Sequence, residues 1–142
     1  MPATGSCLCG AVRAEVDGPL RAVVNCHCTQ CRKWTGHHVA ATAAWKRDLE
    51  LVDPENLLRW YRSSDTAQRG FCSRCGSSLF WEMDGAETMT ILAGMIDGAT
   101  CLETTAEIYV SNRGDYYALA HPPVAQYAKS GHDVRLKQEP DV

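Results

Sequence analysis

The chain has 142 residues, of which 45% are hydrophobic and 22% charged, and its formal net charge at pH 7 is -3. This length suits one compact domain with a hydrophobic core of its own. The slightly acidic balance gives no general attraction to phosphate backbones or anionic lipid, so we expect no nucleic-acid partner and no membrane partner. The same figures predict no particular oligomeric state.

The N-terminus carries no sign of export. Residues 1–6 contain no basic region followed by an apolar stretch, and no apolar run in the chain has the length of a membrane span. We therefore expect a cytoplasmic protein. Because thiols stay reduced in that compartment, the eight cysteines are expected to bind a thiophilic metal, with zinc foremost, rather than to form disulfides.

In chain order, most of the predicted elements are strands. Short alternating runs bounded by Gly, Pro, Asp or Asn predict strands at 11–16, 39–45, 57–62, 68–71, 79–83, 88–92 and 107–110. Short helices are expected at 28–34 and at 121–128, the second because consecutive prolines favour a helix start. The pattern predicts a mainly β domain of sandwich or barrel type over residues 1–130, and the polar residues 131–142 are interpreted as a flexible tail.

Seven of the eight cysteines fall into three clusters with the spacing of metal ligands. The clusters are Cys7 and Cys9; Cys26, Cys28 and Cys31; and Cys72 and Cys75. Structural zinc prefers four protein ligands, whereas catalytic zinc keeps three and leaves one position for water or substrate. Seven ligands therefore suggest one closed site, built from the first and third clusters, and one open site at the second cluster.

Chain topology supports this division. A metal held by Cys7, Cys9, Cys72 and Cys75 would close a loop of about sixty residues, which is what a structural ion does. The second cluster occupies one short stretch, so a metal there stabilises little beyond its own turn.

The alternative is that both sites are structural, with a fourth ligand for the second cluster supplied by a distant residue. The candidates are His37, His38, Cys101 and His121. His27 lies between two ligand cysteines and is expected to point away from their metal. Cys101 has no partner at ligand spacing and is expected to be a small buried residue. Trp34 follows the second cluster and is a candidate wall for a pocket.

At these cysteines the sequence resembles the glutathione-dependent formaldehyde-activating enzyme family, whose domain also occurs in the centromere protein V group. The strongest matches are residues 5–12 (GSCLCGAV), 26–36 (CHCTQCRKWTG) and 71–77 (FCSRCGS), with weaker ones at 93–97 and 107–110. The chain differs from many members at Glu107, where they have histidine, and at Tyr116, where they often have tryptophan.

The resemblance implies a β-tent fold and two zinc ions. The implied structural zinc is bound by Cys7, Cys9, Cys72 and Cys75, and a more labile zinc by Cys26, Cys28 and Cys31. A three-thiolate zinc suits a soft fourth ligand, so the leading hypothesis is a carbon–sulfur lyase of the S-(hydroxymethyl)glutathione synthase type. Its substrates would be a small thiol such as glutathione and an aldehyde such as formaldehyde.

Two other functions stay open. The first is a zinc-stabilised binding or structural module without catalysis. The second is methionine sulfoxide reduction with Cys101 as the reactive thiol, which the sequence favours least, because residues 97–103 supply no activating histidine or arginine.

Overall fold

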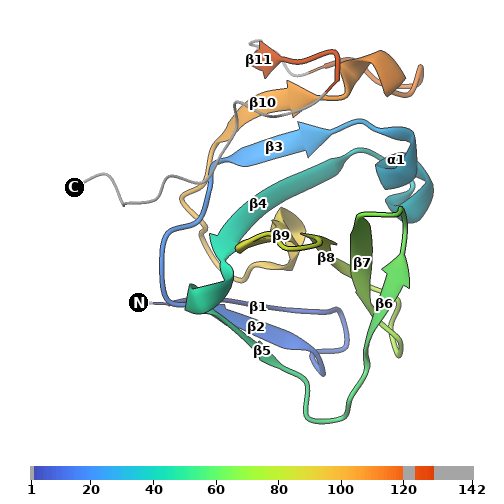
Figure 1. Cartoon of the computed structure of the whole chain (residues 1–142). Helices are drawn as coiled ribbons and strands as arrows, with labels where there is room; N and C mark the ends of the chain where they lie inside the picture. Colours follow the sequence, from blue (N-terminus) through green and yellow to red (C-terminus); the bar gives the residue numbers. More distant parts are fainter. Residues whose placement is uncertain (1, 120–123, 130–142) are drawn as a thin grey trace.

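The computed structural model describes residues 2–119 and 124–129, which form two β-sheets and one short α-helix (Figure 1). The small sheet has the strand order β1-β2-β5, with β1 at Ala3–Ser6, β2 at Arg13–Val16 and β5 at Leu49–Val52. The large sheet has the order β11-β10-β3-β4-β9-β8-β7-β6. Its strands are β3 (Val23–Cys26), β4 (Val39–Trp45), β6 (Leu58–Arg62), β7 (Ala67–Cys72), β8 (Ser78–Met83), β9 (Thr88–Leu92), β10 (Thr104–Ile108) and β11 (Ala125–Gln126).

The main hydrophobic core lies between the two sheets. Residues from β2, β4, β8 and β9 meet there, and the largest fully buried side chains among them are Phe80, Leu79 and Ile91. Cys7 and Cys72 belong to the same core, so the first and third cysteine clusters border it. The core therefore connects directly to one candidate metal site.

A second, smaller core lies where the helix α1 (Thr29–Thr35) packs on the large sheet. It contains Val24, Val39, Ala41 and Ala106, from β3, β4 and β10, together with Cys31 of the helix. Figure 1 shows α1 at one end of β3 and β4, close to β6 and β7. The helix ends at Gly36, whose φ of 88° is accessible to glycine with little strain.

The structure confirms the mainly β architecture and most of the predicted strands. The expected strands at 39–45 and 88–92 match β4 and β9 residue for residue, and the helix expected at 28–34 is α1. Four strands were not predicted from the sequence: β1, β3, β5 and β11. These strands have two to four residues each, too few for a clear alternation pattern.

The prediction of a helix at 121–128 is wrong for residues 124–128, the part of this range that the structure describes. Ala125–Gln126 forms β11, which pairs in parallel with β10, so sheet pairing outweighs the local preference after the two prolines. Residues 131–142, the expected tail, lie outside the described residues, and the domain boundary at residue 130 stays a prediction. None of the described helices is long and apolar enough to cross a membrane, and the cytoplasmic location also stays a prediction.

Candidate functional site

The first and third cysteine clusters meet in space. The sulfur atoms of Cys7, Cys9, Cys72 and Cys75, called here the four-sulfur group, all lie within 4.8 Å of one another. The Cys7–Cys9 sulfur distance is 3.5 Å and the Cys9–Cys72 distance is 3.9 Å. Four thiolates around a tetrahedral zinc, each at about 2.3 Å, would be about 3.8 Å apart. The donor set and its spacing therefore fit zinc.

Two glycine turns present these sulfurs. Gly10 and Gly76 follow the last cysteine of each cluster and have φ values of 80° and 77°. The amide of Gly10 donates to the carbonyl of Cys7 at 3.0 Å, and the amide of Gly76 donates to the carbonyl of Cys72 at 2.8 Å. Because a side chain would strain this left-handed backbone, glycine keeps each turn tight and both cysteines on one side of it.

Ser77 links the two turns. Its hydroxyl oxygen accepts a hydrogen bond from the Leu8 amide at 2.9 Å and lies 3.2 Å from the Cys75 sulfur. The contact with the Ser77 hydroxyl is the main reason why the pKa of Cys75 falls to about 5. The Val12 amide similarly donates to the Cys7 sulfur at 3.3 Å. These donors favour the thiolate form that a metal needs.

The second cluster forms a separate site, called here the three-sulfur group. The sulfurs of Cys26, Cys28 and Cys31 lie within 4.8 Å of one another. Cys26 ends β3, Cys28 is the residue before α1, and Cys31 lies in its first turn. The Cys28 sulfur accepts a hydrogen bond from the Cys31 amide at 3.3 Å, so this ligand also caps the helix.

The three sulfurs are close enough to share protons. Hydrogen bonds from the thiols of Cys26 and Cys31 lower the pKa of Cys28 to about 2, and the contact with Cys28 raises the pKa of Cys26. Such a cluster readily exchanges its protons for a thiophilic cation. Three sulfurs on a short stretch of backbone therefore fit zinc as well as the four-sulfur group does.

No fourth protein ligand completes this group among residues 2–119 and 124–129. His37, His38 and Cys101 do not join the three sulfurs within 4.8 Å, and His121 lies outside the described residues. The His37 ring nitrogen Nδ1 instead lies 3.1 Å from the Tyr116 hydroxyl. The alternative of a distant fourth ligand thus gains no support from the described part of the chain.

The His27 side chain faces Glu107 and Tyr117 rather than the three sulfurs, as expected for a residue between two ligand cysteines. Its Nε2 bonds to the Glu107 carboxylate, and its Nδ1 lies 2.6 Å from the Tyr117 hydroxyl. His27 and Glu107 are each only 1% exposed, and Asn25 donates to the other Glu107 oxygen at 3.1 Å. This buried network holds the backbone between Cys26 and Cys28 from the opposite face of the sheet.

A comparison with protein-family models matches residues 2–112 to the model described as glutathione-dependent formaldehyde-activating enzyme. The chain belongs to this family. All three cysteine clusters lie within the matched residues.

Individual relatives agree with the family match. A protein of Schizosaccharomyces pombe described as an uncharacterized lyase is 28% identical over 120 residues, which cover 82% of this chain and 85% of that protein. A Halomonas elongata protein named for glutathione-dependent formaldehyde activation is 36% identical over 87 residues, covering 56% of this chain and 55% of that protein. A crystal structure of a Rhodobacter sphaeroides protein has a TM-score of 0.55 and 27% identity, covering 69% and 91% of the two chains.

In this member of the family, Cys101 departs from the expectation of a small buried residue. It is exposed, has a φ of 56°, and belongs to neither sulfur group. Its backbone lies in a loop before β10, where no core packs against it. The structure gives no support to a reductase role for this thiol.

Trp34 and Arg69 border the three-sulfur group of this family member. The Arg69 guanidinium lies over the Trp34 ring at 5.0 Å from its centroid, and its Nη1 donates to the Cys31 sulfur at 3.7 Å. Trp34 thus packs against the arginine that contacts Cys31, and its role as a pocket wall stays a prediction. Arg69 belongs to no motif that singles it out in the sequence. Burial and then the charges of the three sulfurs raise the pKa of Tyr109 nearby.

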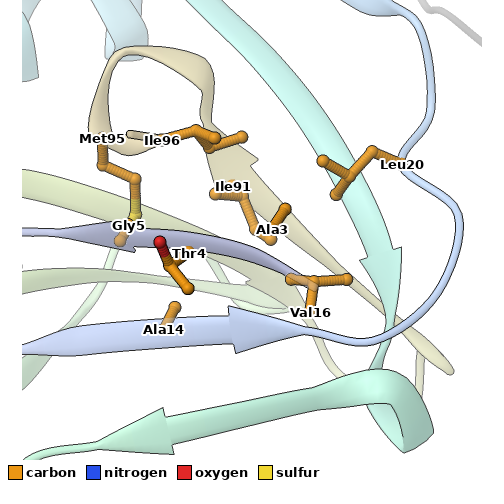
Figure 2. Close-up of a pocket in the computed structure, with 9 residues that line it drawn as sticks. All are labelled: Ala3, Thr4, Gly5, Ala14, Val16, Leu20, Ile91, Met95 and Ile96. Atoms are coloured by element: carbon orange, nitrogen blue, oxygen red, sulfur yellow. The ribbon is translucent and has the colours of Figure 1, made fainter. Parts of the chain in front are cut away.

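Figure 2 shows a pocket elsewhere in the molecule, between the small sheet and the segment after β9. None of its lining side chains is titratable, and none of the seven clustered cysteines lines it. The lining residues are Ala3, Thr4, Gly5, Ala14, Val16, Leu20, Ile91, Met95 and Ile96. The candidate chemistry of the protein therefore lies at the sulfur groups and not in this pocket.

Proposed function

We propose that the chain is a zinc-dependent carbon–sulfur lyase that joins a small thiol to an aldehyde, or catalyses the reverse cleavage. Glutathione and formaldehyde are the proposed substrates, which corresponds to the S-(hydroxymethyl)glutathione synthase type. The lyase and formaldehyde-activating names of the relatives support this choice. Two zinc ions per chain are proposed, a structural one at the four-sulfur group and a labile one at the three-sulfur group.

The main support is the difference in ligand number between the two groups. Four sulfurs complete a tetrahedral site, whereas Cys26, Cys28 and Cys31 provide three ligands, with no fourth among the described residues. A zinc ion in the three-sulfur group would keep an incoming thiol deprotonated at neutral pH and hold its sulfur in place. The chain's own thiolates make this site suited to a soft ligand rather than to water.

The addition itself needs no redox step. The substrate sulfur forms a bond to the carbonyl carbon, the carbonyl π electrons move to oxygen, and the proton released by the thiol ends on that oxygen. Arg69 provides a positive charge next to Cys31, and the Trp34 ring covers its guanidinium. In the reverse reaction the carbon–sulfur bond breaks and the hydroxyl proton returns to the thiol.

The proposal is tested by NMR exchange spectroscopy with glutathione and carbon-13 formaldehyde. The zinc-loaded protein should accelerate exchange between hydrated formaldehyde and the S-hydroxymethyl adduct beyond the spontaneous rate. Cys28→Ser should lose the acceleration, whereas Cys101→Ser, which changes a cysteine outside both groups, should keep it. Wild-type protein with two bound zinc ions and no acceleration for any small thiol–aldehyde pair would favour a structural or binding module instead.

A further inference from the structure

Arg69 is a buried cation on the central part of β7. Its relative exposure is 5%, and its side chain extends from the sheet toward α1. Nη1 donates to the Cys31 sulfur at 3.7 Å, and Nη2 donates to the Gln30 side-chain oxygen at 3.2 Å. The Trp34 ring covers the guanidinium plane. Three residues of one helix thus orient a single arginine.

Within the described ranges, this cation has no carboxylate partner. No Asp or Glu oxygen lies within 4.0 Å of the Arg69 guanidinium, and its Nε has no hydrogen-bond acceptor. A buried charge is costly unless an opposite charge or strong acceptors compensate it. The contact that can supply negative charge is the Cys31 sulfur, which is a thiolate when it binds a metal.

We propose that Arg69 is the counter-ion of the three-sulfur centre and that it makes this centre prefer an anionic fourth ligand over a neutral one. The inference rests on the proposed metal site at Cys26, Cys28 and Cys31 and specifies its ligand class. Arg69 acts through Cys31 and the net charge of the centre, so it is a positioning residue.

Charge balance explains the preference. A divalent ion with three thiolates carries one net negative charge, and a fourth thiolate raises this to two. Repulsion between such charges is strong in a partly buried site, and one adjacent guanidinium offsets part of it. The N–H···S bond also withdraws electron density from the Cys31 sulfur, which leaves the ion a better acceptor for the next ligand.

The fixed geometry of Arg69 makes the charge effective. Stacking on Trp34 and the bond to Gln30 hold the guanidinium fork in place, whereas a lysine ammonium would keep the charge without the fork. The expected order of effect is therefore arginine, then lysine, then an uncharged side chain.

The test uses full-length protein with cobalt in the three-sulfur group. The changes in the cobalt absorption bands are followed during titration with three probes. Two of them bind as anions, mercaptoethanol as its thiolate and azide, and the third is neutral imidazole. Arg69→Met should weaken binding of the two anions by about tenfold or more, which corresponds to about 1.4 kcal/mol, and should change imidazole affinity by less than about threefold. Arg69→Lys should lie between wild type and Arg69→Met, and Arg69→Gln replaces the methionine variant if that one fails to fold.

Arg62→Gln is the matched control. Arg62 lies on the neighbouring strand β6 and pairs with Asp84 at 2.6 Å, and its side chain is 51% exposed. Removing it lowers the total charge by the same amount without touching a sulfur, so all three affinities should stay at wild-type values. Melting temperatures of all variants show whether the fold is kept.

The outcomes separate this inference from the proposed function. Equal losses for anions and imidazole in Arg69→Met, or no loss for the anions, would overturn the role of Arg69. If the wild-type centre binds azide and imidazole but no thiol, the lyase proposal fails while the anion-to-imidazole ratio still tests Arg69. A wild-type centre that takes none of the probes has a filled fourth position, and both proposals are then wrong.

Discussion

The two sulfur groups use the same ligand chemistry but differ in what their backbone connects. The four-sulfur group joins the loop after β1 to the end of β7, and Cys9 and Cys72 are 63 residues apart. The three-sulfur group lies within the junction of β3 and α1. An ion in the first group would therefore stabilise the whole fold, whereas an ion in the second would mainly order its own turn. Ligand number and chain separation together distinguish the two proposed roles.

The largest expected effect comes from removing a ligand of the four-sulfur group. Cys72→Ser should make the protein insoluble or lower its free energy of unfolding by more than about 4 kcal/mol, because Cys72 is fully buried and the proposed structural ion would contribute folding energy. Cys28→Ser should cost less than about 2 kcal/mol, since only a local turn depends on it. Thermal unfolding followed by circular dichroism measures both.

Similar losses in the two variants would contradict this division, because they would show that both groups are structural. Cys101→Ser serves as the reference, since Cys101 is exposed and belongs to neither group. Its melting temperature should equal that of the wild type.

Metal removal should distinguish the groups next. A chelator should take zinc from the three-sulfur group first, because a site with an exchangeable position offers a route for ligand attack. The zinc content, measured by elemental mass spectrometry, should fall from two ions per chain toward one. The far-ultraviolet circular dichroism spectrum should stay unchanged during this loss. Simultaneous loss of both ions would contradict the open site.

The buried network behind the three-sulfur group predicts a smaller effect. Glu107→Ala leaves His27 buried without its main partner and should lower the free energy of unfolding by about 3 kcal/mol. Glu107→Gln, which keeps an acceptor, should lose about half as much. Glu55, which forms an exposed pair with Arg74, is the control, and Glu55→Ala should not change chemical denaturation measurably.

The smallest effect concerns the turn glycines of the four-sulfur group. Gly76→Ala should cost about 1 kcal/mol, because alanine is strained at a φ of 77°. Gly94→Ala is the matched control: its added methyl group also meets open space, but Gly94 has no positive φ. Denaturant midpoints of the two variants give the difference, and equal midpoints would show that the turn tolerates a side chain.

Sequence spacing predicted the two sulfur groups well because each cluster is local and the number of ligands limits the pairings. It also predicted β4 and β9, which have five or more residues with turn residues around them. By contrast, β3 has four residues and ends in a ligand, so its pattern is too short to recognise. The strand at Ala125–Gln126 depends on pairing with β10, which no local signal reveals.

The charged partners of the site were not predictable in the same way. Arg69 reaches Cys31 across 38 residues of sequence, and Glu107 reaches His27 across 80. The first contact depends on how α1 packs beside β7, and the second on the strand order and register that place β10 beside β3. In the sequence, Glu107 is notable only because many members of the formaldehyde-activating family have histidine there. Arg69 lies in no motif and at no ligand spacing that would mark it as part of the site.

The long separation within the four-sulfur group also sets an order of assembly during synthesis. Cys31, the last ligand of the three-sulfur group, leaves the ribosome well before Cys72 and Cys75 do. If both proposed ions bind, a nascent chain could capture its first ion at the site that would contribute less to the final fold. The proposed structural ion would then arrive later, or move there from the earlier site once residue 75 has emerged.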